Sequence, residues 1–152
     1  MTASCGSAPA ATGSGTASTP ARTGRIWRNT HFNSPDATGA AADTADPDGD
    51  RLPNLVEYGL GLQPLLADGA GALTSQWFDA AGARYLSLRV ARDQQHSDLL
   101  YSVEASSDLF SWSAAGTAIL ADTPTLLHVR DLTPTDAAPG GRRFLRLRIT
   151  LP

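Results

Sequence analysis

Apolar and polar residues alternate with a period of two through much of residues 84–151, and this pattern restricts the fold more than any other feature of the chain. It occurs in four segments, residues 84–92, 99–106, 125–131 and 143–151. A β-strand places successive side chains on opposite faces, so each segment is predicted to be a strand with one buried face. Turn-forming residues separate the segments, which predicts an antiparallel sheet folded over as a small sandwich.

Each of the four predicted strands places most of its apolar residues on one face. The residues assigned to that face are Leu86, Leu88, Val90, Leu99, Tyr101, Val103, Ala105, Leu127, Val129, Leu145, Leu147, Ile149 and Leu151. Aromatic residues make up only 7% of the chain, so its few tryptophans are expected to serve as core anchors. Trp112, in the turn sequence SSDLFSW, is accordingly assigned to the core.

An acidic stretch precedes the strand-forming part of the chain. The sequence DPDGDRLPNLVEY, residues 46–58, places Asp46, Asp48 and Asp50 at alternate positions. Three carboxylates this close repel each other unless a cation lies among them. The alternative is a solvated acidic turn that caps the following helix. We favour the cation site, because the remaining residues of the stretch also match one.

The oxygen-bearing residues of this stretch have the spacing of a calcium loop. Calcium takes about six to eight oxygen ligands, and a loop of about twelve residues supplies them from positions 1, 3, 5, 7, 9 and 12, with a backbone carbonyl at position 7. Counted from the first aspartate, these positions hold Asp46, Asp48, Asp50, Leu52, Asn54 and Glu57. The stretch contains no histidine or cysteine, which argues against zinc and copper. The sequence therefore predicts Ca²⁺ as the cofactor, bound as a structural ion.

A short helix is predicted to follow the loop. Its buried face has the i, i+3, i+4, i+8 spacing and consists of Leu52, Leu55, Val56 and Leu60. Pro53 suits the first helical position, and the glycines at 59 and 61 are expected to end the helix. Arg51 occupies loop position 6, where a calcium loop usually has glycine for its sharp turn. Either Arg51 adopts an unfavourable backbone conformation or the loop turns at Gly49, and we expect a lowered calcium affinity.

Composition divides the chain into three parts. Residues 1–24 are almost entirely Ala, Gly, Ser, Thr and Pro, which is typical of a disordered linker. Residues 25–66 are predicted to form a helical segment with the calcium loop, starting with an amphipathic turn or helix at RIWRNTHF. Residues 73–152 are predicted to form the antiparallel β module. The expected fold is mainly β, with a short helix and calcium loop packed on a small antiparallel sheet or sandwich.

The calcium stretch also resembles known proteins. The sequence DPDGDRLPNLVEYGLGLQP is similar to the segment DxDGDGxxNxxEY of thrombospondin type 3 repeats, dockerins and other EF-hand-like loops. Together with IWRNTHF, YSVEASSDLFSW and RRFLRLRIT, it resembles C-terminal modules of large secreted bacterial proteins over residues 25–152. The resemblance implies a non-catalytic, extracellular appendage that displays or anchors its parent polypeptide or a cell-surface component. A single loop with no helix directly before it departs from a full EF-hand and from a dockerin pair.

Charge and hydropathy exclude other classes of function. The net charge is −3, whereas nucleic-acid binding normally leaves a basic footprint. No run of 18 apolar residues is present, so no membrane span is expected. The first residues lack the charged start and apolar centre of a signal peptide. For a secreted or cell-surface protein, we expect the export signal to have been removed or to lie elsewhere.

One alternative stays open beside the structural role. A carbohydrate-binding or adhesive β-sandwich would contact a glycan through the sheet face or a tryptophan. The predicted outward arginines, Arg89, Arg130, Arg146 and Arg148, could form one basic stripe on that face or merely keep it hydrated. The histidines at 31, 96 and 128 lack the spacing of a catalytic or metal motif, so no enzyme is predicted.

Overall fold

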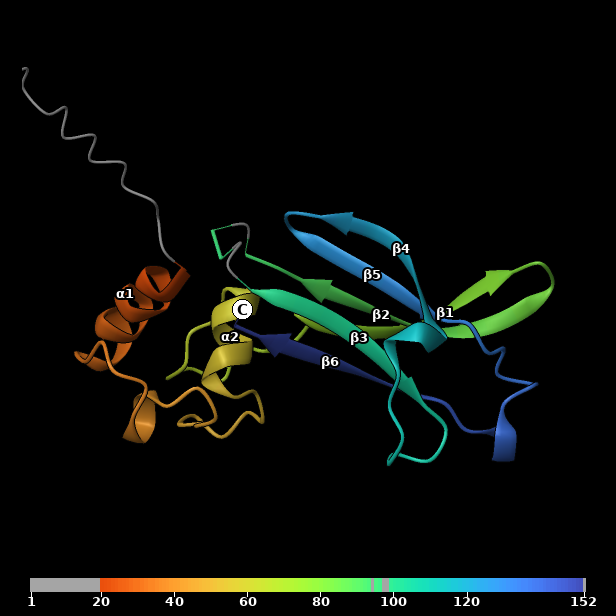
Figure 1. Ribbon diagram of the computed structural model, residues 1–152, viewed down its shortest axis with the longest axis horizontal. Coiled ribbons are helices and arrows are strands. Elements are labelled where there is room, and N and C mark those ends of the chain that lie inside the picture. The colour runs from red at the N-terminus through yellow and green to blue at the C-terminus, as the bar shows by residue number, and fades with distance from the viewer. Residues whose placement is uncertain (1–19, 94, 97–98, 152) are drawn as a thin grey trace, which may run out of the picture.

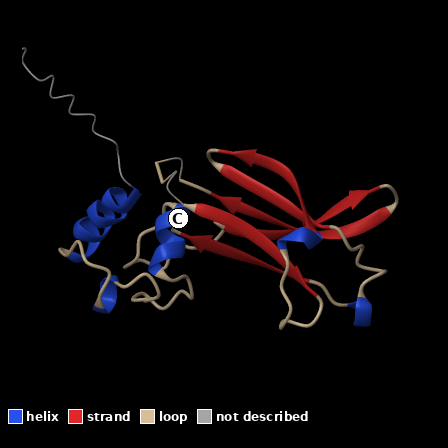
Figure 2. Cartoon of the chain, in the orientation of Figure 1, coloured by secondary structure: helices blue, strands red, loops and turns tan. Residues whose placement is uncertain are grey.

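The computed structural model describes residues 20–93, 95–96 and 99–151 (Figure 1). Residues 1–19, the greater part of the predicted linker, lie outside the described residues. In the described part the chain is mainly β, as predicted, and two α-helices, α1 (Pro20–Phe32) and α2 (Asn54–Leu60), precede the strands (Figure 2). The strands described are β1 (Leu73–Ala80), β2 (Ala83–Ala91), β3 (Leu100–Ser106), β4 (Thr117–Thr123), β5 (Leu126–Asp131) and β6 (Phe144–Thr150).

The strands form two antiparallel sheets. The larger sheet has the order β1-β2-β5-β4, and the smaller sheet pairs β3 with β6. In the larger sheet Leu88 lies opposite Val129, and in the smaller sheet Val103 lies opposite Leu147. These residues all belong to the predicted aliphatic face. The period of two therefore locates the buried face of both sheets.

The alternation of apolar and polar residues does not predict β1 and β4. Both strands lie at the edges of the larger sheet, and neither contains a fully buried residue. The register of β4 also shifts between Ile119 and Ala121, which marks a bulge or irregularity. Because β1 and β4 bury little on either face, their sequences need not place an aliphatic residue at every second position.

The core lies between the two sheets and reaches α2. Its larger cluster joins Leu60 of α2 to aliphatic residues of both sheets, which are Leu88, Val90, Val103, Leu127 and Val129. A second cluster joins Tyr58 of α2 to Leu99 and Ile149, and Trp27 of α1 packs against it. Because α2 contributes to both clusters, the helix is fixed to the sandwich, and the loop before it is fixed as well.

The glycines of α2 act differently from one another. Gly61 has φ +74° and follows the last helical residue, as expected for a helix-ending glycine. Gly59, however, lies inside α2 and does not end it. A Cβ at this position would lie 2.8 Å from Cδ1 of Ile149, so glycine lets the helix approach the sheet. The Tyr101 hydroxyl, on the neighbouring strand, donates a hydrogen bond to the Gly59 carbonyl at 2.7 Å.

Two residues assigned to the core lie elsewhere. Leu151 is 40% exposed, because it follows Thr150, the last residue of β6 paired with β3. Trp112 is half-buried and belongs to neither core cluster. Its indole N–H donates to the Leu109 carbonyl at 3.0 Å, and the Arg146 guanidinium carbon lies 4.4 Å from its ring centroid. The assignment of Trp112 to the core is therefore wrong, since aliphatic residues fill the interior without it.

The arginines predicted as one stripe are divided between the two sheets. Arg89 and Arg130 lie on β2 and β5, whereas Arg146 and Arg148 lie on β6. The inner faces of these sheets pack together, so the outer faces point in different directions. Arg146 and Arg148 also lie 2.6 and 3.8 Å from the Glu104 carboxylate. The four side chains do not form a continuous basic stripe.

Candidate metal centre

The loop that precedes α2 is held by its own aspartates. The carboxylates of Asp46, Asp48 and Asp50 accept hydrogen bonds from backbone N–H groups two to five residues further along, at 2.8 to 3.1 Å. Each bond bends the chain back toward the carboxylate that accepts it. These hydrogen bonds within the loop therefore hold the three side chains near one another.

Arg51 resolves the question raised by position 6 of the loop. Its φ is +77°, in the left-handed region that costs a residue with a Cβ about 1–2 kcal/mol. Gly49 also has φ +77°, so the chain turns at both positions. The Arg51 N–H donates to Asp46 Oδ2 at 3.0 Å, which holds the unfavourable conformation in place. The loop thus keeps the turn of a calcium loop although the glycine is missing.

The three aspartates form a group that could hold a metal ion. One carboxylate oxygen from each of Asp46, Asp48 and Asp50 lies within 4.8 Å of the other two. Asp46 is exposed, and the other two are half-buried. Asp48 Oδ2 is buried and has no hydrogen-bond partner among the described residues. Like charges at this separation destabilise the loop unless a cation is shared among them.

Glu57, on α2, is a buried carboxylate near the three aspartates. Its side chain is 0% exposed, yet neither carboxylate oxygen has a hydrogen-bond partner in the described part of the chain. Burial raises the pKa of Glu57 to about 7, and the nearby carboxylates of Asp48, Asp50, Asp68 and Asp46 contribute to the rise in that order. A buried and unpaired carboxylate is strongly unfavourable, and a bound cation would remove the cost.

Asn54 offers a second unpaired acceptor. The residue is 1% exposed, and its side-chain N–H groups donate to the carbonyls of Ala40 and Ala42 at 2.8 and 2.7 Å. These two bonds fix the orientation of the amide. They leave Asn54 Oδ1 buried without a partner among the described residues. An amide oxygen in this state has the chemistry of a metal ligand.

Leu52 contributes through its backbone. Its N–H donates to Asp50 Oδ1 at 2.8 Å, and its side chain packs against the larger core cluster. The residue therefore connects the loop to the sandwich. The ligand role of its carbonyl oxygen stays a prediction from the spacing.

Asp68 is a neighbour of the centre that the spacing does not include. The next residue, Gly69, donates its N–H to Asp50 Oδ2 at 3.3 Å. A Cβ on Gly69 would lie 2.4 Å from Leu52 Cδ1 and 2.7 Å from Asp50 Oδ2, so the segment crosses directly over the loop. Asp68 lies outside the twelve-residue pattern, and only its place in a second Asp-Gly pair could have indicated it.

The histidines do not extend this centre. His128 Nε2 lies 3.3 Å from the Ser87 hydroxyl, the one histidine–serine contact among the described side chains. Ser87 is 0% exposed, and its hydroxyl donates to the Gln76 carbonyl at 3.0 Å. A hydroxyl in this state is inaccessible to a substrate. His96 instead stacks on Tyr58, with ring centroids 3.8 Å apart.

Comparisons with known proteins add nothing to this description of the candidate centre. Within the described part of the chain, no helix is both long and apolar enough to cross a membrane. Comparison with protein-family models, with curated proteins and with solved structures finds no match for this chain.

Proposed function

We propose that this chain is a non-catalytic, calcium-stabilised module in which the ion joins the loop of residues 46–57 to the β-sandwich. The observation that carries the proposal is the Glu57 carboxylate, which is fully buried, unpaired and close to three aspartates. Once Glu57 is ionised, neither of its oxygens has a hydrogen-bond partner among the described residues. A cation would convert the repulsion within the cluster into attraction.

The chemistry of the donors favours calcium. The proposed ligands are side-chain oxygens of Asp46, Asp48, Asp50, Asn54 and Glu57, with the backbone carbonyl of Leu52. The group that could hold a metal ion among the described residues consists of the three aspartates, and soft metals prefer histidine or cysteine. Magnesium demands near-ideal octahedral geometry and keeps several waters, whereas calcium accepts about six to eight oxygens at flexible angles. Calcium therefore fits this set better than zinc or magnesium.

The position of α2 favours a structural ion over a switch. Glu57 is followed directly by Tyr58, and both Tyr58 and Leu60 are core residues. Binding at Glu57 therefore stabilises the helix on which two core clusters depend. An ion that binds only the folded form stabilises it by about 2.7 kcal/mol at a hundredfold excess over its dissociation constant.

The same site supports a secreted or cell-surface location. The left-handed Arg51 costs free energy that a glycine would not, so we infer a weak site. Extracellular calcium modules work with dissociation constants of about 10⁻⁴–10⁻³ M, which suits a weak structural site. In this proposal the module is an appendage that displays or anchors its parent polypeptide or a cell-surface component.

Thermal melts in calcium and in chelator test the proposal. The wild-type chain should melt at a higher temperature in calcium, and Glu57→Gln should remove that difference. Glu104→Gln is the matched control, because Glu104 pairs with arginines on the smaller sheet and should leave the calcium effect intact. Equal melting of wild type and Glu57→Gln under both conditions would contradict the proposal.

A further inference from the structure

A cavity lies at the end of the sandwich that is away from the candidate metal centre. The turn of the β1–β2 hairpin is at the end of the molecule away from α1 and α2 (Figure 1). Trp77 and Leu86 of this hairpin line a cavity of about 280 Å³. Its other wall includes Thr135 and Arg142 of the connection between β5 and β6, and Phe144 at the start of β6. The cavity shares no lining residue with the metal centre.

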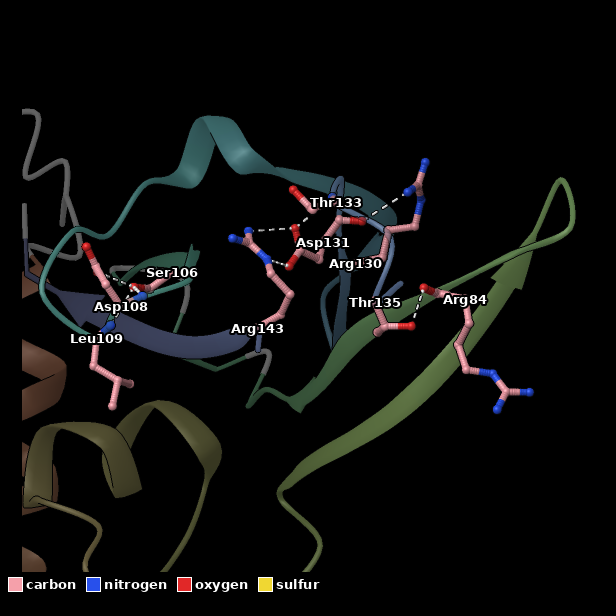
Figure 3. A network of polar contacts seen from close by, with 9 residues as sticks. All are labelled: Arg84, Ser106, Asp108, Leu109, Arg130, Asp131, Thr133, Thr135 and Arg143. Carbon is pink, nitrogen blue, oxygen red and sulfur yellow. Dashed lines mark hydrogen bonds and ion pairs between the residues drawn. The ribbon is translucent and has the colours of Figure 1, made fainter. Parts of the chain in front are cut away.

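The wall formed by the β5–β6 connection is fixed before any ligand binds. Asp131 is 0% exposed and accepts hydrogen bonds from Arg143 Nε at 2.5 Å and Arg143 Nη2 at 2.9 Å (Figure 3). Further along, Thr135 donates its N–H and its hydroxyl to the Arg84 carbonyl at 2.8 and 3.1 Å. These contacts tie the connection to the larger sheet at two points. The cavity is therefore preorganised.

Trp77 gives the cavity a flat apolar side. Its side chain is 59% exposed and belongs to neither core cluster. It pairs with Leu86 across the hairpin, and Leu86 and Phe144 are half-buried beside it. A single exposed apolar side chain is common on a protein surface. This one differs because it borders a cavity with further apolar residues.

Arg142 gives the cavity an unpaired charge. It is exposed, and it makes no hydrogen bond or ion pair with any described residue. Its neighbour Arg143 is paired with Asp131, so Arg142 carries the available positive charge of the lining. A guanidinium presents a planar fork of donors that matches the two oxygens of a carboxylate.

From this geometry we infer that the cavity binds one acidic sugar unit of a polysaccharide, with Trp77 stacking on the ring and Arg142 pairing with the carboxylate. The C–H face of a pyranose is apolar and flat, which suits an indole, and a uronic acid adds the carboxylate. The volume lies just below the usual range of about 300–1,000 Å³ for small-molecule pockets, which suits a single ring. This binding goes beyond the proposed structural role of calcium and does not depend on it.

The test uses two probes that differ only in the carboxylates. Calorimetric titration of the full chain with a β-1,4-linked glucuronic acid trisaccharide should show binding, and cellotriose should bind at least about tenfold more weakly. That ratio corresponds to the loss of one charge-assisted hydrogen-bonded pair. Equal binding of the two probes, or no binding of the acidic one, would overturn the inference.

Variants locate the binding. Trp77→Ala and Arg142→Gln should each weaken binding of the acidic trisaccharide by about tenfold or more, and Trp77→Phe should keep most of it. Arg148→Gln, on the smaller sheet, is the control and should bind as wild type does. Melting temperatures of all variants establish that they fold. Unchanged binding by folded Trp77→Ala, or a concentration-dependent dimer that this substitution abolishes, would assign the apolar surface to another role and overturn the inference.

Discussion

Two loops of this protein use acidic residues in opposite ways. In the turn of residues 106–111, Asp108 accepts a hydrogen bond from the Ser106 hydroxyl at 3.0 Å (Figure 3). It also accepts hydrogen bonds from Ser111 N–H at 2.7 Å and from Phe110 N–H at 2.9 Å. These bonds, the Ser111 bond most of all, lower the pKa of Asp108 to about 2. Around residues 46–57, burial and neighbouring carboxylates instead raise the pKa of Glu57 to about 7.

The two loops differ in whether the backbone supplies hydrogen-bond partners to the carboxylate. The backbone of the 106–111 turn satisfies Asp108, so that loop is complete as it stands. Glu57 is buried without any partner among the described residues, so its loop leaves both carboxylate oxygens unsatisfied. The presence of an acidic residue alone would not separate the two loops. Counting unsatisfied buried oxygens does.

The largest expected effect of this difference is that the stability of calcium-free protein depends on pH. The native state holds the Glu57 proton up to about pH 7, whereas the ordinary value is 4.5, so between these values the native state binds more protons. Stability from this group is therefore present below pH 4.5 and is lost as pH rises through about 7. The rise in pKa corresponds to a loss on the order of 3 kcal/mol.

Urea unfolding from pH 5 to pH 8 in chelator measures this loss. Saturating calcium should remove the decline, because the ion keeps Glu57 ionised in the native state at every pH of the series. Glu57→Gln should show a flatter pH profile than wild type in chelator. If both proteins lose the same stability across this range, Glu57 is not the group responsible.

Gly69→Ala is expected to have the next largest effect. The added Cβ would lie 2.4 Å from Leu52 Cδ1 and 2.7 Å from Asp50 Oδ2, so both side chains must move. Such overpacking costs about 1–3 kcal/mol, and the displaced Asp50 should also bind calcium more weakly. Chemical unfolding with and without calcium measures both effects. Ala70→Ser, on the same segment, is the control and should change neither; a Gly69→Ala variant that behaves as Ala70→Ser does would contradict the close crossing.

Asp68→Asn should have a smaller effect on calcium binding, and it tests whether Asp68 belongs to the centre. Asp68 raises the pKa of Glu57 although it lies outside the twelve-residue spacing. Removing its charge should weaken calcium binding about threefold to tenfold, as the attraction of one nearby charge would predict. Asp79→Asn is the control, since Asp79 pairs with Arg84 on the distant hairpin. Identical calcium affinities for Asp68→Asn and wild type would place Asp68 outside the centre.

The smallest effect concerns Asp108, which should respond to acid and ignore calcium. Its pKa lies below the ordinary 3.8, so its contribution to stability is present above that value and is lost as pH falls through about 2. Asp108→Asn should lower stability at neutral pH and leave the shift produced by calcium unchanged, as thermal melts in calcium and in chelator would measure. A calcium shift that vanishes in this variant would undo the distinction between the two loops.

Much of the fold could be predicted because four of the described strands alternate between apolar and polar residues. β2, β3, β5 and β6 bury one face each, so Leu88, Val103 and Val129 are visible in the sequence as inward residues. The edge strands β1 and β4 bury little and carry no such pattern. The prediction for Trp112 is wrong because size alone does not decide burial, and its partners Leu109 and Arg146 are not neighbours that periodicity reveals.

The candidate centre is partly visible in the sequence for a similar reason. Ligand spacing is local, so the sequence indicates Asp46, Asp48 and Asp50 and also Glu57 on the following helix. The decisive property of Glu57, its complete burial without a partner among the described residues, arises from the packing of α2 on the sheets and has no local signature. The approach of Asp68 likewise depends on a segment that crosses the loop.

Calorimetric titration of chelator-treated protein with calcium tests the central claim most directly. Wild type should bind about one ion per chain, with a dissociation constant at or below the millimolar range, and Glu57→Gln should give no saturable heat. Silence from the wild-type chain at millimolar calcium, or equally tight binding by Glu57→Gln, would contradict a centre built around this buried carboxylate.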